Sequence, residues 1–213
     1  MFSFIVCCND NSQLDSYYIP SVEMARKWAR DNNLPEIESL VIRGSSSISK
    51  SYNYGIKIAK YPIKIFIHQD VHLLNSSWIP KLFYAFSSSD VGLVGMVGTT
   101  KLSTKGFWWD SGEEYLRGEL FSGLEKADWV FSKENSTIDV TTVDGFFMAT
   151  NRSIPFDEGV KGFHFYDMDY SRTMLSLGLK VRLINHKAWH IGKIRDQDTH
   201  DLMEYFYAKW GGD

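Results

Sequence analysis

Short apolar runs alternate with segments of helical periodicity through the first half of the chain, and this alternation strongly restricts the fold. Four apolar runs have the length of buried strands, at residues 2–8, 37–42, 63–67 and 91–97. Each segment between two runs repeats apolar side chains at helical spacing. This order predicts an α/β fold with a mostly parallel central sheet, flanked by helices and joined by right-handed crossovers.

The second half of the chain has a less regular pattern. Residues 99–139 show no clear period, and a stretch of that length without regular structure is usually functional or a lid. An apolar strand is expected at 143–150, a helix at 167–177 and a half-exposed strand at 179–183. A last helix is expected at about 199–210. The 213 residues have the size of a single domain.

Composition excludes several classes of protein. The formal net charge of -3 leaves no basic field for nucleic acid, and no apolar run approaches the about 20 residues of a membrane span. The N-terminal segment lacks the basic start of a signal peptide. Cys7 and Cys8 would point to opposite faces of a strand, so we expect two free thiols and a cytoplasmic location. Any contact with a membrane would be peripheral.

A polar cluster follows the apolar run at 63–67. If the chain stays extended, His68 and Asp70 point to the same side, because side chains alternate along a strand. Ligands of open α/β sheets bind at the carboxyl ends of the strands. A carboxylate and an imidazole there can hold a divalent metal or a polar ligand, although a solvated strand end would have the same pattern.

Three further polar clusters lie at the ends of apolar segments. They are Asp144-Gly145, the segment from His164 to Asp169 with Tyr166-Asp167 inside it, and Trp189-His190. Together with His68-Gln69-Asp70, they form an ordered set that resembles the GT-A nucleotide-sugar glycosyltransferases of family 2 type. The resemblance is greatest to the glycosyltransferase-like branch that carries His-Gln-Asp where relatives carry Asp-x-Asp.

This resemblance implies a GT-A fold with a donor half at about residues 1–98 and an acceptor half at about 99–213. The first strand ending at Asn9 and the helix start Tyr52-Asn53-x-Gly55 are similar to the donor half. The implied donor-binding residues are Cys8, Asn9, Arg43, Asn53, Gln69 and Asp70. The implied donor is a nucleotide-sugar, with a UDP-sugar as the first choice.

The resemblance also implies a metal site and a catalytic base. Asp70, with His68 and His190, would hold Mn²⁺ or Mg²⁺ on the donor diphosphate, and a packed histidine is the alternative for His190. Asp167 would act as general base on the acceptor hydroxyl in one inverting displacement. A position near a helix N-terminus would keep Asp167 deprotonated at neutral pH, although Asp167 and Asp169 also suit helix caps.

Three positions depart from the family pattern. Tyr166 replaces the usual Glu of a Glu-Asp pair, and His68 replaces the first acid of Asp-x-Asp. Arg43 lies where many members have an Asp that binds the nucleobase, so the base stays open. Arg43 could contact phosphate or simply face solvent.

The acceptor side is the least defined part of the expected site. Tryptophan rings offer apolar faces to sugars, so Trp108 and Trp109 are candidates, with two core tryptophans as the alternative. The resemblance adds Asp144 and Gly145. His164 precedes the expected base and could touch the acceptor, or be solvated or packed.

These features favour a hexosyltransferase-like enzyme that moves a sugar to a glycan or glycoconjugate acceptor in polysaccharide biosynthesis. One alternative is a catalytically silent nucleotide- or sugar-binding domain of a larger glycan-assembly protein. Another is a metal-dependent hydrolase that uses His68, Asp70 and His190, which would need a tighter ligand cluster than the sequence reveals.

Overall fold

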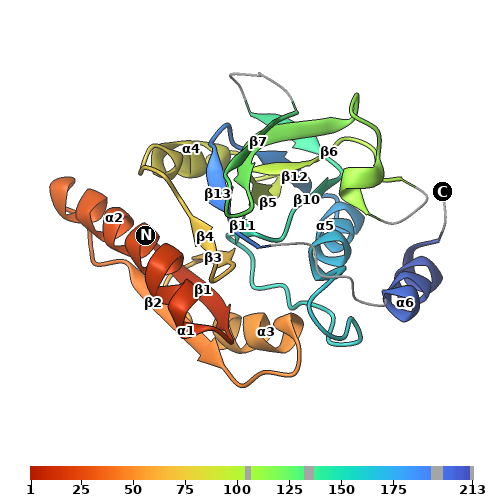
Figure 1. The fold of residues 1–213 in the computed structure, drawn as a ribbon, viewed down its shortest axis with the longest axis horizontal. Coiled ribbons are helices and arrows are strands. Elements are labelled where there is room, and N and C mark those ends of the chain that lie inside the picture. Colours follow the sequence, from red (N-terminus) through yellow and green to blue (C-terminus); the bar gives the residue numbers. More distant parts are fainter. Residues whose placement is uncertain (104–106, 132–136, 193–198, 212–213) are drawn as a thin grey trace.

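The computed structural model describes residues 1–103, 107–131, 137–192 and 199–211. In this part of the chain, the central sheet has seven strands in the order β2-β1-β3-β11-β5-β12-β9 (Figure 1). In that order they span Glu38–Arg43, Phe2–Cys8, Ile63–Ile67, Phe147–Thr150, Val91–Gly95, Lys180–Leu183 and Ile138–Val140.

Strand directions make this sheet more mixed than predicted. β1 runs parallel to β2 and β3, and β12 runs parallel to β5. β11 inserts between β3 and β5 in the opposite direction, and β9 is antiparallel to β12. The predicted α/β fold with a central sheet flanked by helices is confirmed.

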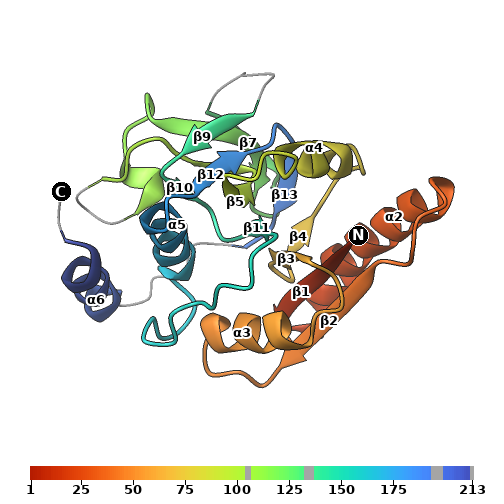
Figure 2. The ribbon, with the colours of Figure 1, turned by 180° about the vertical axis from the view of Figure 1, so that it is seen from behind.

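Helices cover both faces of the central sheet. They are α1 (Asn11–Gln13), α2 (Ile19–Asp31), α3 (Ile48–Ile58), α4 (Trp78–Ala85), α5 (Tyr166–Ser176) and α6 (His200–Trp210), with a π-helical turn at Leu14–Tyr18. Val22 of α2 and Leu82 of α4 belong to the core on one face, whereas Tyr52 of α3 and Met174 of α5 belong to the core on the other. The two views place α2 and α6 at opposite ends of the molecule (Figures 1 and 2).

A second, smaller sheet occupies much of the region where an irregular segment was predicted. Its order is β10-β6-β7-β13-β4, and β8 pairs with β7. These strands span Thr142–Val143, Val97–Thr99, Leu116–Ser122, Ala188–His190, Val71–His72 and Ala127–Val130 (β8). The prediction of an irregular segment at 99–139 is therefore wrong where β7 and β8 lie, whereas the described residues 100–103 and 107–115 form no strand and contain one short helical turn, Trp108–Asp110. Strands β7 and β8 lack an apolar alternation because β8 is exposed throughout and β7 is mostly half-buried.

Two predicted strands are divided between the sheets. The apolar run at 91–97 ends as β5 at Gly95 and resumes as β6 at Val97, and the run at 143–150 separates into β10 and β11. The second break leaves Asp144 and Gly145 in a turn between the two sheets. This division places polar groups of the acceptor half beside the end of β3.

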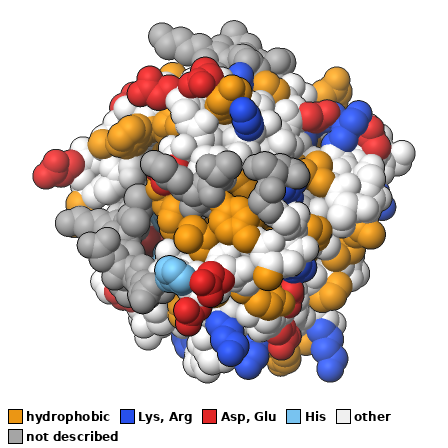
Figure 3. Space-filling model, turned by 90° about the vertical axis from the view of Figure 1, so that its right-hand side faces the viewer, with side chains coloured by type: hydrophobic (Ala, Val, Ile, Leu, Met, Phe, Trp, Pro, Cys, Tyr) orange, Lys and Arg blue, Asp and Glu red, His pale blue; other side chains and the backbone are white. Residues whose placement is uncertain are grey.

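The thiols and the surface agree with the composition. Cys7 and Cys8 are free, and they pack on opposite faces of the central sheet, as predicted. Among the described residues, no helix combines the length and apolar character needed to cross a bilayer. The face at the α6 end exposes apolar side chains near its centre (Figure 3).

Candidate active site

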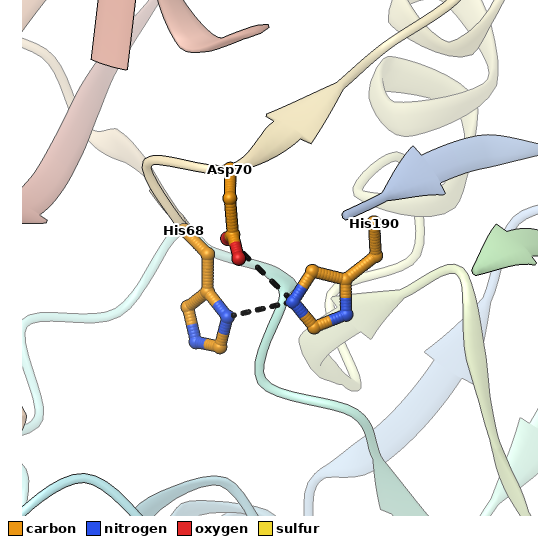
Figure 4. Close-up of side chains that lie close together, drawn as sticks. All are labelled: His68, Asp70 and His190. Atoms are coloured by element: carbon orange, nitrogen blue, oxygen red, sulfur yellow. Dashed lines mark hydrogen bonds and ion pairs between the residues drawn. The ribbon is translucent and has the colours of Figure 1, made fainter. Parts of the chain in front are cut away.

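His68, Asp70 and His190 converge at the place where the two sheets meet. β3 ends at Ile67, and the N–H of His68 donates to the carbonyl oxygen of Phe146. Asp70 directly precedes β4, whose Val71 pairs with His190 of β13. The Ile191 N–H donates to the Asp70 carbonyl, so strand register alone holds His190 beside Asp70. Figure 4 shows the three side chains pointing toward one another.

Their distances fit the ligand set of one divalent metal. His190 Nε2 lies 3.4 Å from His68 Nδ1 and 3.6 Å from Asp70 Oδ1. One ligand atom from each residue lies within 4.8 Å of the other two. Two ligand atoms about 2.1 Å from one ion lie about 3.0 Å apart at a right angle and about 3.4 Å apart at a tetrahedral angle. Two imidazoles and one carboxylate suit Mn²⁺ better than Mg²⁺, which prefers oxygen ligands.

Gly192 leaves the space that this ligand set needs. A Cβ at Gly192 would lie 2.6 Å from Asp70 Oδ2 and 2.9 Å from His190 Nε2. Such contacts are shorter than van der Waals contact, so a larger residue would displace one of the two ligands. The backbone at Gly192 therefore passes close to the side chains of both Asp70 and His190.

The charges of the cluster are coupled. Burial opposes the charged form of Asp70, but the hydrogen bond and charge of His190 outweigh it and lower the pKa of Asp70 to about 2. Burial and the charge of His190 lower the pKa of His68 to about 4. His190 has a raised pKa because Asp70 stabilises its charged form more than burial disfavours it. At neutral pH, Asp70 is therefore an anion and His68 a neutral imidazole.

Asp167 lies in the first turn of α5, where both of its oxygens accept backbone hydrogen bonds. Oδ2 accepts from Gly145 N at 2.9 Å, and Oδ1 accepts from Met168 N at 2.9 Å. Burial, together with the charge of Asp144, raises the pKa of Asp167 to about 7. The expectation that the helix N-terminus keeps Asp167 fully deprotonated is wrong, because desolvation outweighs these two hydrogen bonds.

Tyr166 connects Asp167 with the histidine cluster. Its Oη lies 2.5 Å from His68 Nε2, and a Cβ at Gly145 would overlap that same oxygen. The two residues that depart from the family motifs, His68 and Tyr166, are thus hydrogen-bonded to each other. Sequence reasoning missed this contact, although both departures were visible in the sequence.

The ends of β1 and β2 border a cavity of about 360 Å³, and its residue Asn9 is hydrogen-bonded to Gln69, the neighbour of Asp70 in the chain. Its lining includes the predicted donor residues Cys8, Asn9 and Arg43. It also includes residues that the sequence did not single out, namely Cys7, Asn11, Gly44, Ser45 and Phe163. Arg43 donates to Asn11 Oδ1 at 3.1 Å, which holds its guanidinium at the cavity wall.

A sequence profile described as the glycosyltransferase like family matches residues 3–209. The chain belongs to this glycosyltransferase-like family. A search of curated proteins gave no match. Among solved structures, GalNAc-T7 with UDP, GalNAc and Mn²⁺ aligns with a TM-score of 0.60 at 10% identity, over 92% of this chain and 44% of that one.

Two other solved structures have the same fold at similar distance. The mannosyltransferase PcManGT from Pyrobaculum calidifontis, in complex with GDP-Man and Mn²⁺, has a TM-score of 0.56 at 10% identity, over 99% of this chain and 62% of that chain. TarS 1-349 from S. aureus in complex with UDP has a TM-score of 0.56 at 12% identity, over 98% and 64%. The glycosyltransferase-like chain has the GT-A fold of these proteins and spans less than two thirds of their length.

Two of the predicted donor residues in this glycosyltransferase-like protein make hydrogen bonds within the chain. The Asn53 amide donates to Phe156 O and Glu158 Oε1 and accepts from Phe156 N, so it anchors a loop of the acceptor half to α3. Gln69 Oε1 accepts from the backbone N–H groups of Asn9 and Asp10. Gln69 therefore joins the end of β1 to the end of β3, beside the cavity, whereas Asn53 is not among the cavity residues.

Among the predicted acceptor residues of the glycosyltransferase-like chain, Asp144 and His164 lie near Asp167 and His68, whereas the two tryptophans differ from each other in exposure. Asp144 lies close to Asp167, and burial raises its pKa, whereas His164 is near enough to His68 to lower that residue's pKa. Trp108 is only 5% exposed and belongs to the core, which favours its alternative interpretation. Trp109 is 36% exposed, stacks on Phe107 with ring centroids 4.6 Å apart, and makes an edge contact with Trp108.

Proposed function

We propose that this protein is a metal-assisted glycosyltransferase that moves a sugar from a nucleotide-sugar to a carbohydrate acceptor. One observation carries the proposal. A three-ligand cluster and a carboxylate of raised pKa are joined through His68 and Tyr166 at the meeting point of the two sheets. The three-residue cluster could hold a cation that neutralises negative charge, and the Asp167 carboxylate could accept a proton.

His68, Asp70 and His190 would hold the metal ion, and Mn²⁺ fits their donor atoms. A bound divalent cation would supply positive charge to offset the negative charge that develops on the departing nucleoside diphosphate. The cavity beside Cys8, Asn9 and Arg43 would take the nucleotide. The relatives with UDP or with GDP-Man support a nucleoside diphosphate, and UDP-sugars are tested first.

Asp167 would act as the general base. An acceptor hydroxyl gives its proton to the Asp167 carboxylate while its oxygen forms a bond to the anomeric carbon. The bond from that carbon to the diphosphate oxygen breaks in the same displacement, so the anomeric centre inverts. A pKa of about 7 is well matched to this role, because the carboxylate is a stronger base than an exposed one and about half of it is ionised at pH 7.

The pH dependence follows from this pKa. Only the deprotonated carboxylate accepts a proton, so we expect kcat/KM to fall about tenfold per pH unit below pH 7. A nearby cation would move the midpoint to lower pH. Initial rates between pH 5 and 9 test this expectation, and the residual activity of Asp167→Asn should lack the acid limb. An acid limb that persists in that variant would assign it to another group.

The two free cysteines support a cytoplasmic location, since they suit a reducing compartment. A role in polysaccharide biosynthesis is consistent with Trp109, whose exposed ring suits a sugar face. Asp144, Gly145 and His164 would line the same acceptor side. The partners would be a nucleotide-sugar donor and a carbohydrate acceptor, and any contact with a membrane would be peripheral. The chain covers only 44% of GalNAc-T7.

A metal-dependent hydrolase is the second candidate. The ligand atoms of His68, Asp70 and His190 cluster more tightly than the sequence indicated, and Asp167 could equally take a proton from water. Cleavage of the donor alone does not separate the two activities. Attachment of the sugar to an added glycan does, because a hydrolase produces only free sugar.

Nucleotide binding gives the first test of the proposed function. We expect at least one of UDP, GDP and dTDP to raise the melting temperature when Mn²⁺ is present, and to have less effect with Mg²⁺. At about 100 times Kd, a ligand stabilises the native state by about 2.7 kcal/mol. Thermal melts with each nucleotide, with and without metal, measure this shift. If all three nucleotides leave the melting temperature unchanged with Mn²⁺, the proposed donor site is wrong.

A further inference from the structure

We propose that Tyr166 is a positioning residue that turns His68 into a metal ligand, an inference that rests on the metal-assisted function proposed above. The phenol holds one ring nitrogen of His68, so that the other nitrogen presents its lone pair to Asp70 and His190. The replacement of Glu by Tyr at position 166 and of an acid by His at position 68 then forms one functional unit.

The first step of the argument is the direction of the His68 ring. Its two nitrogens have different partners, since Nε2 contacts Tyr166 Oη at 2.5 Å and Nδ1 contacts His190 Nε2 at 3.4 Å. A rotation of the ring by half a turn would break both contacts. The phenol is fixed in turn, because the Tyr166 ring packs edge-on against Tyr52 at 5.8 Å and its oxygen lies over Gly145.

The second step is the position of the His68 proton. His190 Nε2 lies 3.6 Å from Asp70 Oδ1 and 3.4 Å from His68 Nδ1, so Nδ1 is the His68 nitrogen that faces the other two residues of the cluster. A neutral imidazole that binds a metal through Nδ1 carries its one proton on Nε2. Tyr166 Oη, 2.5 Å from that nitrogen, is placed to accept this proton.

The third step is what this tautomer does. A metal ligand needs a free lone pair, and His68 Nδ1 has one as long as Nε2 keeps the proton. Partners on the second nitrogen of ligating histidines orient the ring and raise its basicity, and their loss costs about 10–100-fold in metal affinity. Tyr166 is the residue that holds the second nitrogen of His68, and it adjoins Asp167 in the chain.

Tyr166→Phe tests this role, because it removes the hydroxyl and keeps the ring. We expect Mn²⁺ affinity, measured by electron paramagnetic resonance of free Mn²⁺, to fall about 10–100-fold. Tyr52→Phe is the matched control. Its hydroxyl is buried in the same aromatic group and has no hydrogen-bond partner among the described residues, so its loss should leave Mn²⁺ affinity unchanged.

A double-mutant cycle shows whether Tyr166 acts through His68. In a His68→Ala background, Tyr166→Phe should change Mn²⁺ affinity less than about twofold, since the residue it positions is gone. Full additivity of the two losses would overturn the inference. So would a Tyr166→Phe protein that binds Mn²⁺ as tightly as the wild type.

A metal-free measurement separates this inference from the proposed function. Nitrogen-15 chemical shifts of the imidazoles report the tautomer, and His68→Ala identifies the signal. We expect the Nε2-protonated form of His68 in the wild type and a mixture of tautomers in Tyr166→Phe. If the wild type binds no Mn²⁺, the proposed metal site fails, and the tautomer still decides the role of Tyr166. An unchanged tautomer in Tyr166→Phe would overturn it.

Discussion

Asp167→Asn should reduce turnover by about 10²–10⁴-fold while nucleotide binding stays near the wild-type value. The substitution removes the proton acceptor and keeps the shape of the side chain. Asn retains one acceptor oxygen for Gly145 N or Met168 N, and the other N–H loses its partner at a cost of about 1–3 kcal/mol. Removal of a desolvated charge beside Asp144 offsets part of this cost.

Asp169→Asn is the matched control on the same helix. Asp169 is 2% exposed and accepts hydrogen bonds from Lys209 Nζ at 2.7 Å and from Trp210 Nε1 at 2.8 Å, so it anchors α6. Asn keeps an oxygen for Trp210, but Lys209 loses one of its two carboxylate partners and retains Asp157, so this variant should melt below the wild type. We nevertheless expect it to keep its turnover below its melting temperature.

Steady-state rates and thermal melts of the two variants therefore separate the two roles. The Asp169 variant should be destabilised but active, because Asp169 anchors α6, whereas Asp167 is the proposed base. An active Asp167→Asn enzyme would remove Asp167 from the mechanism and leave Asp144 as the next acid to test, since it lies beside Asp167. The assignment of the fold would be unaffected.

Asp70→Ala should abolish Mn²⁺-linked nucleotide binding and leave the protein folded. Asp70 is the only carboxylate among the three residues of this cluster, which is the proposed metal site. Loss of a direct ligand should exceed the about 10–100-fold cost of losing an outer partner, so we expect Mn²⁺ affinity to fall by more than about 100-fold. The backbone of Asp70 still accepts from Ile191 N, so the pairing of β4 with β13 survives.

Calorimetry of Mn²⁺ binding measures this loss, with Asp90→Ala as its control. Asp90 is also an ion-paired carboxylate, 2.7 Å from Lys180 Nζ, but it lies at the amino end of β5, whereas Asp70 follows the carboxyl end of the parallel strand β3. Its removal should leave Mn²⁺ affinity unchanged. Equal Mn²⁺ affinity in Asp70→Ala and the wild type would mean that Asp70 is not a ligand.

Much of this architecture follows from local patterns in the sequence. The apolar runs at β1 and β3 are strong signals because these strands are buried on both faces, whereas β12 and the helices α2 and α5 bury one face and show regular apolar spacing. Strands β7 and β8 of the second sheet gave no such signal. Its strand β8 is exposed along its whole length, and Gly118 in β7 has a positive φ of 101°, so neither carries a regular apolar alternation.

The site shows the same division between local and long-range information. His68, Asp70 and His190 could be singled out because polar residues at strand ends are visible in the sequence. The contact between His68 and Tyr166 joins residues 98 positions apart, and only the tertiary fold reveals it. Asn53 illustrates the reverse case, since a motif suggested a donor contact and the fold uses its amide to hold the loop at Phe156.

The sequence did not indicate how strongly burial raises the pKa of Asp167. The helix N-terminus beside Asp167 predicted a low pKa, and burial next to Asp144 instead raises it to about 7. For Trp108, the sequence left an acceptor contact and a core position open, and the structure shows that this residue is 5% exposed.

Product analysis after incubation with nucleotide-sugars tests the central claim most directly. Wild type and Asp167→Asn are each mixed with Mn²⁺, one UDP-, GDP- or dTDP-sugar and a set of oligosaccharide acceptors, and the products are resolved by mass spectrometry. We predict nucleoside diphosphate together with an acceptor heavier by one sugar residue, in the wild type only. Free sugar as the only sugar product, or equal yields from both proteins, would contradict the account.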